Sequence, residues 1–189
     1  MISDHLALTA LLREDLAAFI AKTFQVVSPN DSFMPAWYID LMADYLMRCA
    51  LGDITRLIIT VPPRSLKSIS ASVALPAWVL GRDPSRKIIC ASYSSDLAAK
   101  FSRDCRAVME SDWYRELFPV TRLKRSAELD LETTRKGVRY ATSVGGTLTG
   151  RGGSLIIIDD PLKPQEAPSE TQRKSLKQWF DNTLYSRLD

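Results

Sequence analysis

Three short apolar runs, each about as long as a β-strand, constrain the fold of this chain most. They are LIITV at 57–61, the run at 87–92 and the run at 154–159, and helical patterns separate them. Continuous apolar runs of this kind are typical of parallel strands that are buried on both faces. The sequence therefore predicts an α/β domain with a mostly parallel sheet and helices on both of its faces.

Apolar residues at helical spacing predict the helices around these strands. We expect helices over 4–24, from Pro35 onward, over about 66–80, from Ser94, and from Ser169, where a capping box with Gln172 opens the last one. The alternating pattern over 128–142 predicts a β-hairpin. The inward faces of the first two helices are predicted as Leu8, Leu12, Leu16, Phe19, Ile20 and Phe24, and as Tyr38, Leu41, Met42, Tyr45, Leu46 and Cys49. Residues 1–54 are expected to pack, as an N-terminal helical segment, on a core formed by 55–189 within a single domain.

Composition excludes several classes of protein. No apolar run approaches the roughly 20 residues that cross a bilayer, and the first residues include acids that a signal peptide lacks. Three widely spaced cysteines and a single histidine argue against a disulfide framework and a zinc site. A net charge of +3 permits nucleic-acid binding without arguing for it. We therefore expect a cytosolic protein that does not associate with membranes.

The segment PPRSLKS, which follows the first apolar run, has the features of a phosphate-binding turn. Phosphates need converging backbone N–H groups, a cation and, for magnesium, a hydroxyl, and a turn that opens a helix supplies them. The predicted phosphate-contacting residues are Pro63, Arg64, Ser65, Leu66, Lys67 and Ser68. Lys67 is the cation, Ser68 the candidate magnesium ligand, and Arg64 a candidate contact of the γ-phosphate. Both glycines of the usual pattern are replaced, by Val61 and Leu66, so an ordinary polar loop is the alternative.

Two adjacent carboxylates end the apolar run at 154–159. Ligands of open α/β sheets bind at the carboxyl ends of the strands, where Asp159 and Asp160 are expected. We assign the magnesium to Asp159 and the activation of the attacking water to Asp160. An Asp-Asp-Pro turn that merely ends a strand is the alternative.

A glycine-rich stretch before these carboxylates, GGTLTGRGG, carries a single guanidinium, that of Arg151. This side chain is a candidate arginine finger, which would contact the γ-phosphate of ATP bound to a neighbouring subunit. Contact with a DNA phosphate and a plain solvated position are the alternatives.

Four segments together resemble the ATPase domain of the large terminase subunit of tailed bacteriophages and prophages. They are FMPAWYIDLMADYL, RLIITVPPRSLKS, GGTLTGRGGSLIIIDDPLKP and WFDNTLYSRL, and the similarity runs from about Phe33 to Asp189. The resemblance implies a RecA-type additional-strand P-loop ATPase that uses ATP and Mg²⁺ to drive double-stranded DNA into a procapsid. It also implies a homo-oligomeric ring, a small terminase subunit and a portal protein as partners, and the cytoplasm of the bacterial host as location. Trp37 and Tyr38 match the adenine-contacting motif of the family, whereas core packing is the alternative for Trp37.

The chain departs from the family pattern in three places. The family usually has glycine where Leu66 precedes the lysine, and many members have Glu where this chain has Asp160. The nuclease domain that normally follows is not expected within these residues, so DNA cleavage is not predicted. Two other functions remain: a degenerate, non-hydrolysing nucleotide- or DNA-binding prophage remnant, and a RecA-type helicase or translocase.

Overall fold

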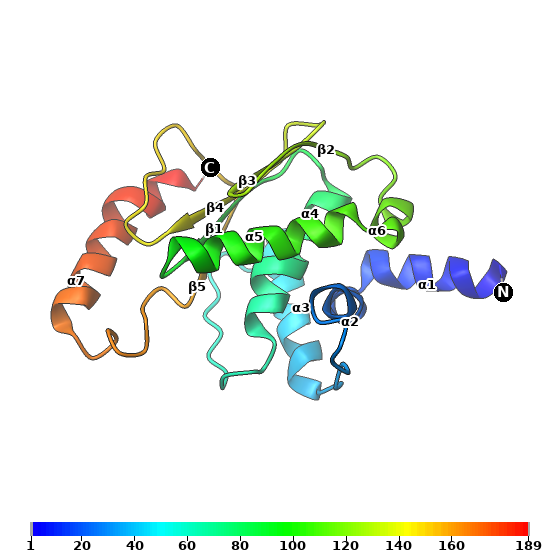
Figure 1. Cartoon of the computed structure of the whole chain (residues 1–189), viewed down its shortest axis with the longest axis horizontal. Coiled ribbons are helices and arrows are strands. Elements are labelled where there is room, and N and C mark those ends of the chain that lie inside the picture. The colour runs from blue at the N-terminus through cyan, green and yellow to red at the C-terminus, as the bar shows by residue number, and fades with distance from the viewer. Residues whose placement is uncertain (1, 189) are drawn as a thin grey trace.

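The computed structural model describes residues 2–188, so the outermost residues of the expected domain, Met1 and Asp189, lie outside it. Figure 1 shows the arrangement of the elements along the chain. Their bounds are α1 Ile2–Glu14, α2 Leu16–Val27, α3 Trp37–Leu51, η1 Ile69–Ala74, α4 Leu75–Arg82, β1 Lys87–Ser92, α5 Ser95–Glu110, α6 Asp112–Leu117, β2 Leu123–Ala127, β3 Asp130–Thr133, β4 Val138–Ser143, β5 Leu155–Asp159, α7 Glu170–Trp179, η2 Phe180–Leu184 and η3 Tyr185–Arg187.

The strands of the described chain form one five-stranded sheet in the order β2-β3-β4-β1-β5. The strand β1 pairs in parallel with β4 and β5, whereas β2, β3 and β4 pair in antiparallel fashion. The expectation of a mostly parallel sheet is therefore wrong, and the sheet is mixed. Short turns join β2 to β3 and β3 to β4, and such turns can only connect antiparallel neighbours. The α/β class and the predicted hairpin are confirmed.

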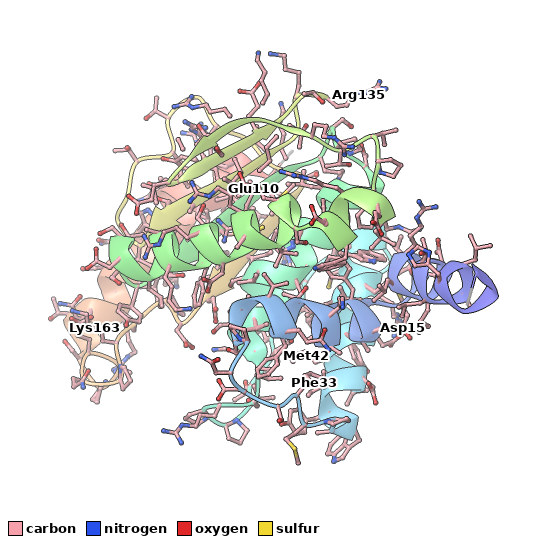
Figure 2. The ribbon with its side chains drawn as sticks, turned by 45° about the vertical axis from the view of Figure 1, so that its right-hand side comes forward. Asp15, Phe33, Met42, Glu110, Arg135 and Lys163 are labelled. Carbon is pink, nitrogen blue, oxygen red and sulfur yellow. The ribbon has the colours of Figure 1, made fainter. Side chains whose placement is uncertain are left out.

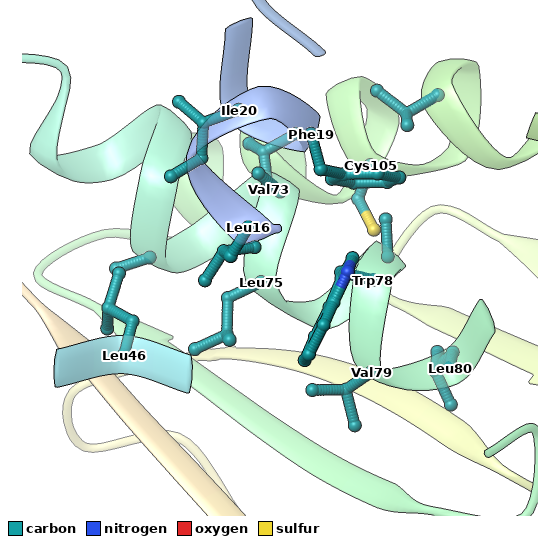
Figure 3. Packing of buried hydrophobic residues seen from close by; sticks show 14 of the residues in the cluster. Leu16, Phe19, Ile20, Leu46, Val73, Leu75, Trp78, Val79, Leu80 and Cys105 are labelled. Atoms are coloured by element: carbon teal, nitrogen blue, oxygen red, sulfur yellow. The ribbon is translucent and has the colours of Figure 1, made fainter. Parts of the chain in front are cut away.

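Helices cover both faces of this sheet, as predicted. Along β1, Ile88 and Cys90 belong to one hydrophobic cluster, whereas Ile89 and Ala91 belong to another. The larger cluster joins the sheet to α2, α3, η1, α4 and α5, and the smaller joins it to Trp179 and to η2. Figure 3 shows the interior of the larger cluster, where α2 lies against η1 and α4. The N-terminal helices thus share one core with the residues around the sheet.

The predicted strand at 57–61 is not a strand. Its residues are extended and alternate between half-buried and exposed, with Leu57 and Ile59 against the larger cluster. Ile58 faces outward and is 91% exposed. The segment has the period of a strand, but within residues 2–188 no neighbour pairs with it. The strand next to the carboxylates, β5, is an edge of the described sheet.

The predicted first helix is divided in two by Asp15. Its carboxylate accepts the N–H groups of Ala17 and Ala18 at 2.7 and 3.1 Å and so caps the start of α2. Figure 2 labels Asp15 at this break. The predicted apolar face is buried from Leu12 to Phe24, whereas Leu8 is exposed.

The second predicted helix exists, but its start and its buried face differ from the expectation. Ala36 is the N-cap of α3, so Pro35 lies before the helix instead of in its first turn. Its buried residues are Ile39, Met42, Ala43, Leu46 and Ala50, whereas Leu41 and Tyr45 are exposed. The buried stripe, which contains Ala43 and Ala50, belongs to the larger cluster together with residues of α2 and α4.

The predicted helix at about 66–80 is confirmed, but it contains a π-helical segment. It follows the turn at 62–66, called the phosphate turn because phosphate binding is predicted for it. Helical backbone begins at Lys67 and continues through η1 and α4 to Arg82. The N–H of Leu75 bonds to the carbonyl of Ser70, five residues earlier. Pro76 explains this widening, because a proline ring inside a helix clashes with the carbonyl four residues before it and has no N–H to donate.

Two helix starts are confirmed by their caps. The hydroxyl of Ser94 accepts the N–H of Leu97 at the start of α5, and that of Ser169 accepts the N–H of Gln172 at the start of α7. On the last helix Trp179 and Leu184 are buried as predicted, whereas Phe180 and Leu188 are largely exposed. None of the helices described here is both long and apolar enough to cross a bilayer.

Candidate functional site

The candidate site lies where β5 ends and the helix after the phosphate turn begins. Asp159 is the last residue of β5 and pairs with Ser92, the last residue of β1, so it stands at the carboxyl edge of the parallel strands. The next residue, Asp160, accepts the N–H of Tyr93 on its carbonyl at 3.1 Å. The sequence-based placement of the carboxylates at this edge is confirmed.

The backbone of the phosphate turn has the shape that glycine usually gives it. Arg64 and Leu66 have positive φ values of 65° and 59°, and neither is glycine. This left-handed conformation costs an L-residue roughly 1–2 kcal/mol. Ser65, between them, is buried and donates its hydroxyl to the carbonyl of Pro62. The turn therefore keeps a left-handed residue directly before the lysine, although Leu66 bears a side chain there.

Lys67 joins the two halves of the site. Its ammonium lies 3.2 Å from Oδ1 of Asp159 and also donates to Oδ1 of Asp160, 93 positions away in the sequence. Burial lowers the pKa of Lys67, but the hydrogen bonds and charges of Asp160 and Asp159 outweigh it, and the pKa is raised above its usual value. The lysine is therefore a cation at neutral pH, and its charge is directed at the carboxylates.

Asp159 is buried and held from two sides. Its side chain has only 3% of its surface exposed, and while Oδ1 faces Lys67, Oδ2 accepts the hydroxyl of Ser72 at 3.0 Å. A buried carboxylate is tolerated only when donors surround it. The serine is one helical turn beyond Ser68, and sequence reasoning missed it.

The side chains at this edge are oxygen donors of the kind that Mg²⁺ binds. The carboxylates of Asp159 and Asp160 and the hydroxyl of Ser68 are oxygen donors, and the Ser68 hydroxyl has no hydrogen-bond partner within the described chain. No group of three or more His, Cys, Asp or Glu side chains able to hold a metal occurs among residues 2–188. Mg²⁺ typically uses one or two carboxylates together with water and substrate phosphates, so this sparse set fits it.

Of the remaining predicted contacts of a nucleotide, Arg64 and Trp37 are exposed and Tyr38 is half-buried. Arg64 lies on the surface of the turn with its guanidinium unpaired within the described residues. Trp37 is 75% exposed, so core packing is wrong for it, whereas Tyr38 packs against the larger cluster. The two rings meet edge to face with centroids 6.2 Å apart. In Figures 1 and 2 the start of α3 and the turn before η1 lie toward the same end of the molecule.

Arg151 is not brought together with Lys67. Its guanidinium lies 3.0 Å from the carboxylate of Asp130 and 4.0 Å from the centre of the Tyr140 ring. Tyr140 pairs with Ile89 in the middle of β1, whereas the carboxylates lie at the strand ends. The glycine-rich loop is also anchored, since the indole of Trp179 donates to the carbonyl of Gly146 at 3.2 Å. Any finger role for Arg151 requires that it first leave Asp130.

A second residue that sequence reasoning missed is Arg139, on β4. Its side chain is completely buried, and Nη2 donates to the backbone carbonyl of Ser72 at 2.9 Å. The other guanidinium nitrogens, Nε and Nη1, have no partner among the described residues. The sequence did show an arginine within the alternating strand VRYAT, which is an unusual residue for a strand with a buried face. Its position in the strand did not show which group it contacts.

Comparison of the chain with models of protein families and with curated proteins finds no match.

Proposed function

We propose that this chain is the ATPase domain of a phage DNA-packaging terminase motor, which binds Mg-ATP at the turn ending in Lys67. The observation that carries the proposal is the contact of Lys67 with Asp159 and Asp160. A lysine at the start of a helix, facing a pair of carboxylates at the end of a parallel strand, is the arrangement that P-loop ATPases use. The RecA-type topology is part of the proposal.

Each residue of the site has a task in this proposal. Lys67 would turn from the carboxylates to the β- and γ-phosphates, and backbone N–H groups of the turn would bind phosphate oxygens. Ser68 and Asp159 would hold Mg²⁺, which neutralises charge on the phosphates when it is bound. Once released by the lysine, Asp160 would orient and deprotonate the attacking water. Arg64, unpaired in the turn, would contact the γ-phosphate, and Trp37 and Tyr38 the adenine.

The partners of the motor follow from the resemblance of the flanking segments. They are double-stranded DNA, a small terminase subunit, a portal protein and further copies of the chain in a ring. The site in Arg64 to Ser68 and Asp159 to Asp160 supports nucleotide use, and the flanking segments support the kind of machine. The host cytoplasm is the corresponding location.

Saturable binding of Mg-ATP is the direct test. We expect a fluorescent ATP analogue to bind the wild-type chain, to be displaced by ATP, and to bind Lys67→Ala about 10- to 100-fold more weakly, because charge-assisted hydrogen bonds are lost. Lys174→Ala is the matched control, since Lys174 is an exposed lysine paired with Glu170 on α7. No saturable binding of the wild type at millimolar ATP would refute the proposal. Equal binding by Lys67→Ala and the wild type would refute the site.

A second function, a nucleotide-binding remnant that does not hydrolyse ATP, is favoured by Leu66. Its side chain packs against the larger cluster inside the phosphate turn, where the family has glycine. In this case the chain binds Mg-ATP but releases no phosphate from it. This holds even when DNA is present and the chain is concentrated enough to form oligomers. Phosphate release that depends on Asp160 would exclude the remnant.

A further inference from the structure

We propose that Ser72, held in place by Arg139, is a positioning residue that fixes the carboxylate of Asp159 for Mg-ATP. The consequence for nucleotide binding rests on the proposed function. Hydrogen bonds connect η1 with β4 and β5, between residues 67 and 87 positions apart in the sequence.

Ser72 makes one bond with each of its polar groups. Its hydroxyl donates to Oδ2 of Asp159 at 3.0 Å, and its backbone carbonyl accepts Nη2 of Arg139 at 2.9 Å. All three residues are buried, with exposures of 1%, 4% and 0%. Hydrogen bonds to charged groups are the stronger ones, and a buried network fixes its members when the bonds are made. Because Oδ2 is taken by the serine, Oδ1 is the oxygen that faces Lys67.

Pro76 removes the donor that the carbonyl of Ser72 would have in a regular α-helix. In an α-helix this carbonyl would accept the N–H of the residue four positions later, and that residue is a proline without an N–H. A buried carbonyl without a donor costs about 1–3 kcal/mol. The guanidinium of Arg139 donates to this carbonyl from β4. Arg139 on β4 is therefore hydrogen-bonded to the π-helical segment that precedes Pro76.

Arg139 also places a positive charge behind the site. It is a fully buried cation, and none of the ion pairs of the described residues includes it. Two hydrogen bonds, one to each side of Ser72, separate its guanidinium from the carboxylate of Asp159. Loss of the guanidinium should therefore change the orientation of Asp159 through Ser72, without any direct contact with the nucleotide.

The first experiment compares Ser72→Ala with Ser70→Ala. Both serines are buried in η1, but the hydroxyl of Ser70 has no hydrogen-bond partner among the described residues. We expect Ser72→Ala to raise the Mg²⁺ concentration at half-saturation of ATP binding about 10-fold, as loss of a group that orients a metal ligand usually does. Ser70→Ala should leave it unchanged. Equal half-saturation for Ser72→Ala and the wild type would overturn the inference.

The second experiment needs no nucleotide. Arg139→Met should lower the melting temperature less in a Pro76→Ala background than alone, because the alanine restores a backbone N–H for the Ser72 carbonyl. A side chain that only fills space would cause the same loss in both backgrounds, and that result would contradict the inference. If Arg139→Met yields no folded protein in either background, Ser72→Ala decides the question.

The two proposals fail in different ways. Absence of Mg-ATP binding by the wild type would refute the proposed function. The positioning of Asp159 would then be judged by stability, since only Ser72→Ala leaves Oδ2 buried without a donor. It must melt at a lower temperature than Ser70→Ala, and equal melting temperatures would refute the inference.

Discussion

Leu66 provides a test of whether the phosphate turn stores backbone strain. Its φ of 59° lies in the left-handed region, where a Cβ atom costs roughly 1–2 kcal/mol. Glycine avoids this cost but loses more chain entropy on folding, about 0.5–1 kcal/mol relative to alanine. The difference predicts that Leu66→Gly is more stable than Leu66→Ala by about 0.5–1 kcal/mol. Both variants lose the leucine atoms beyond Cβ, so their comparison mainly reports the backbone.

Thermal unfolding followed by circular dichroism measures this difference. For a chain of this size about 1 kcal/mol shifts the melting temperature by roughly 2–4 °C, so Leu66→Gly should melt about 1–4 °C above Leu66→Ala. Leu176 is the matched control, because it is a half-buried leucine inside the α-helix α7. There the order must be reversed, with the alanine variant more stable than the glycine variant.

The same variants connect strain to nucleotide binding. We expect Leu66→Gly to bind Mg-ATP more tightly than the wild type, by less than about tenfold, because it removes both the strain and the side chain from the phosphate turn. If Leu66→Ala is as stable as Leu66→Gly, while the Leu176 variants keep the expected order, the reasoning about the left-handed turn is wrong.

Three other predictions concern charge, thiols and aromatic exposure. The raised pKa of Lys67 makes its ion pairs stabilising below the ordinary lysine pKa of about 10.4, and this contribution is lost as the pH rises through the raised value. The free energies of unfolding in urea of the wild type and Lys67→Met should therefore differ by a constant amount between about pH 7 and 9 and converge at higher pH. A difference in unfolding free energy that vanishes below about pH 9 would contradict this prediction. Burial raises the pKa of Cys105 to about 12 and also raises that of Cys90, so a thiol reagent should label Cys49 first in the native chain, and all three only in denaturant. Trp37→Ala should leave the stability within about 0.5 kcal/mol and weaken Mg-ATP binding, and a large stability loss in thermal unfolding would show that Trp37 is a packing residue.

Features that depend only on residues close together in the sequence were predictable from it. The caps at Ser94 and Ser169, the hairpin and the strand that ends in Asp159 all follow from local periodicity and hydrogen bonding. The face of α3 was predicted wrongly because two adjacent apolar stripes satisfy the same helical period. The break at Asp15 was missed because the apolar period continues across it.

The sequence by itself therefore identified the candidate residues of the site, apart from Ser72 and Arg139. The lysine, the hydroxyls and the carboxylates are recognisable from the turn and the strand that contain them. Only the tertiary structure decided that Lys67 contacts both carboxylates, that Arg151 is bound to Asp130, and that 57–61 pairs with no strand of residues 2–188. It also decided that the buried guanidinium of Arg139 donates to the carbonyl of Ser72. Such contacts depend on the register of strands and on the packing of helices distant in the sequence, and no local pattern encodes either.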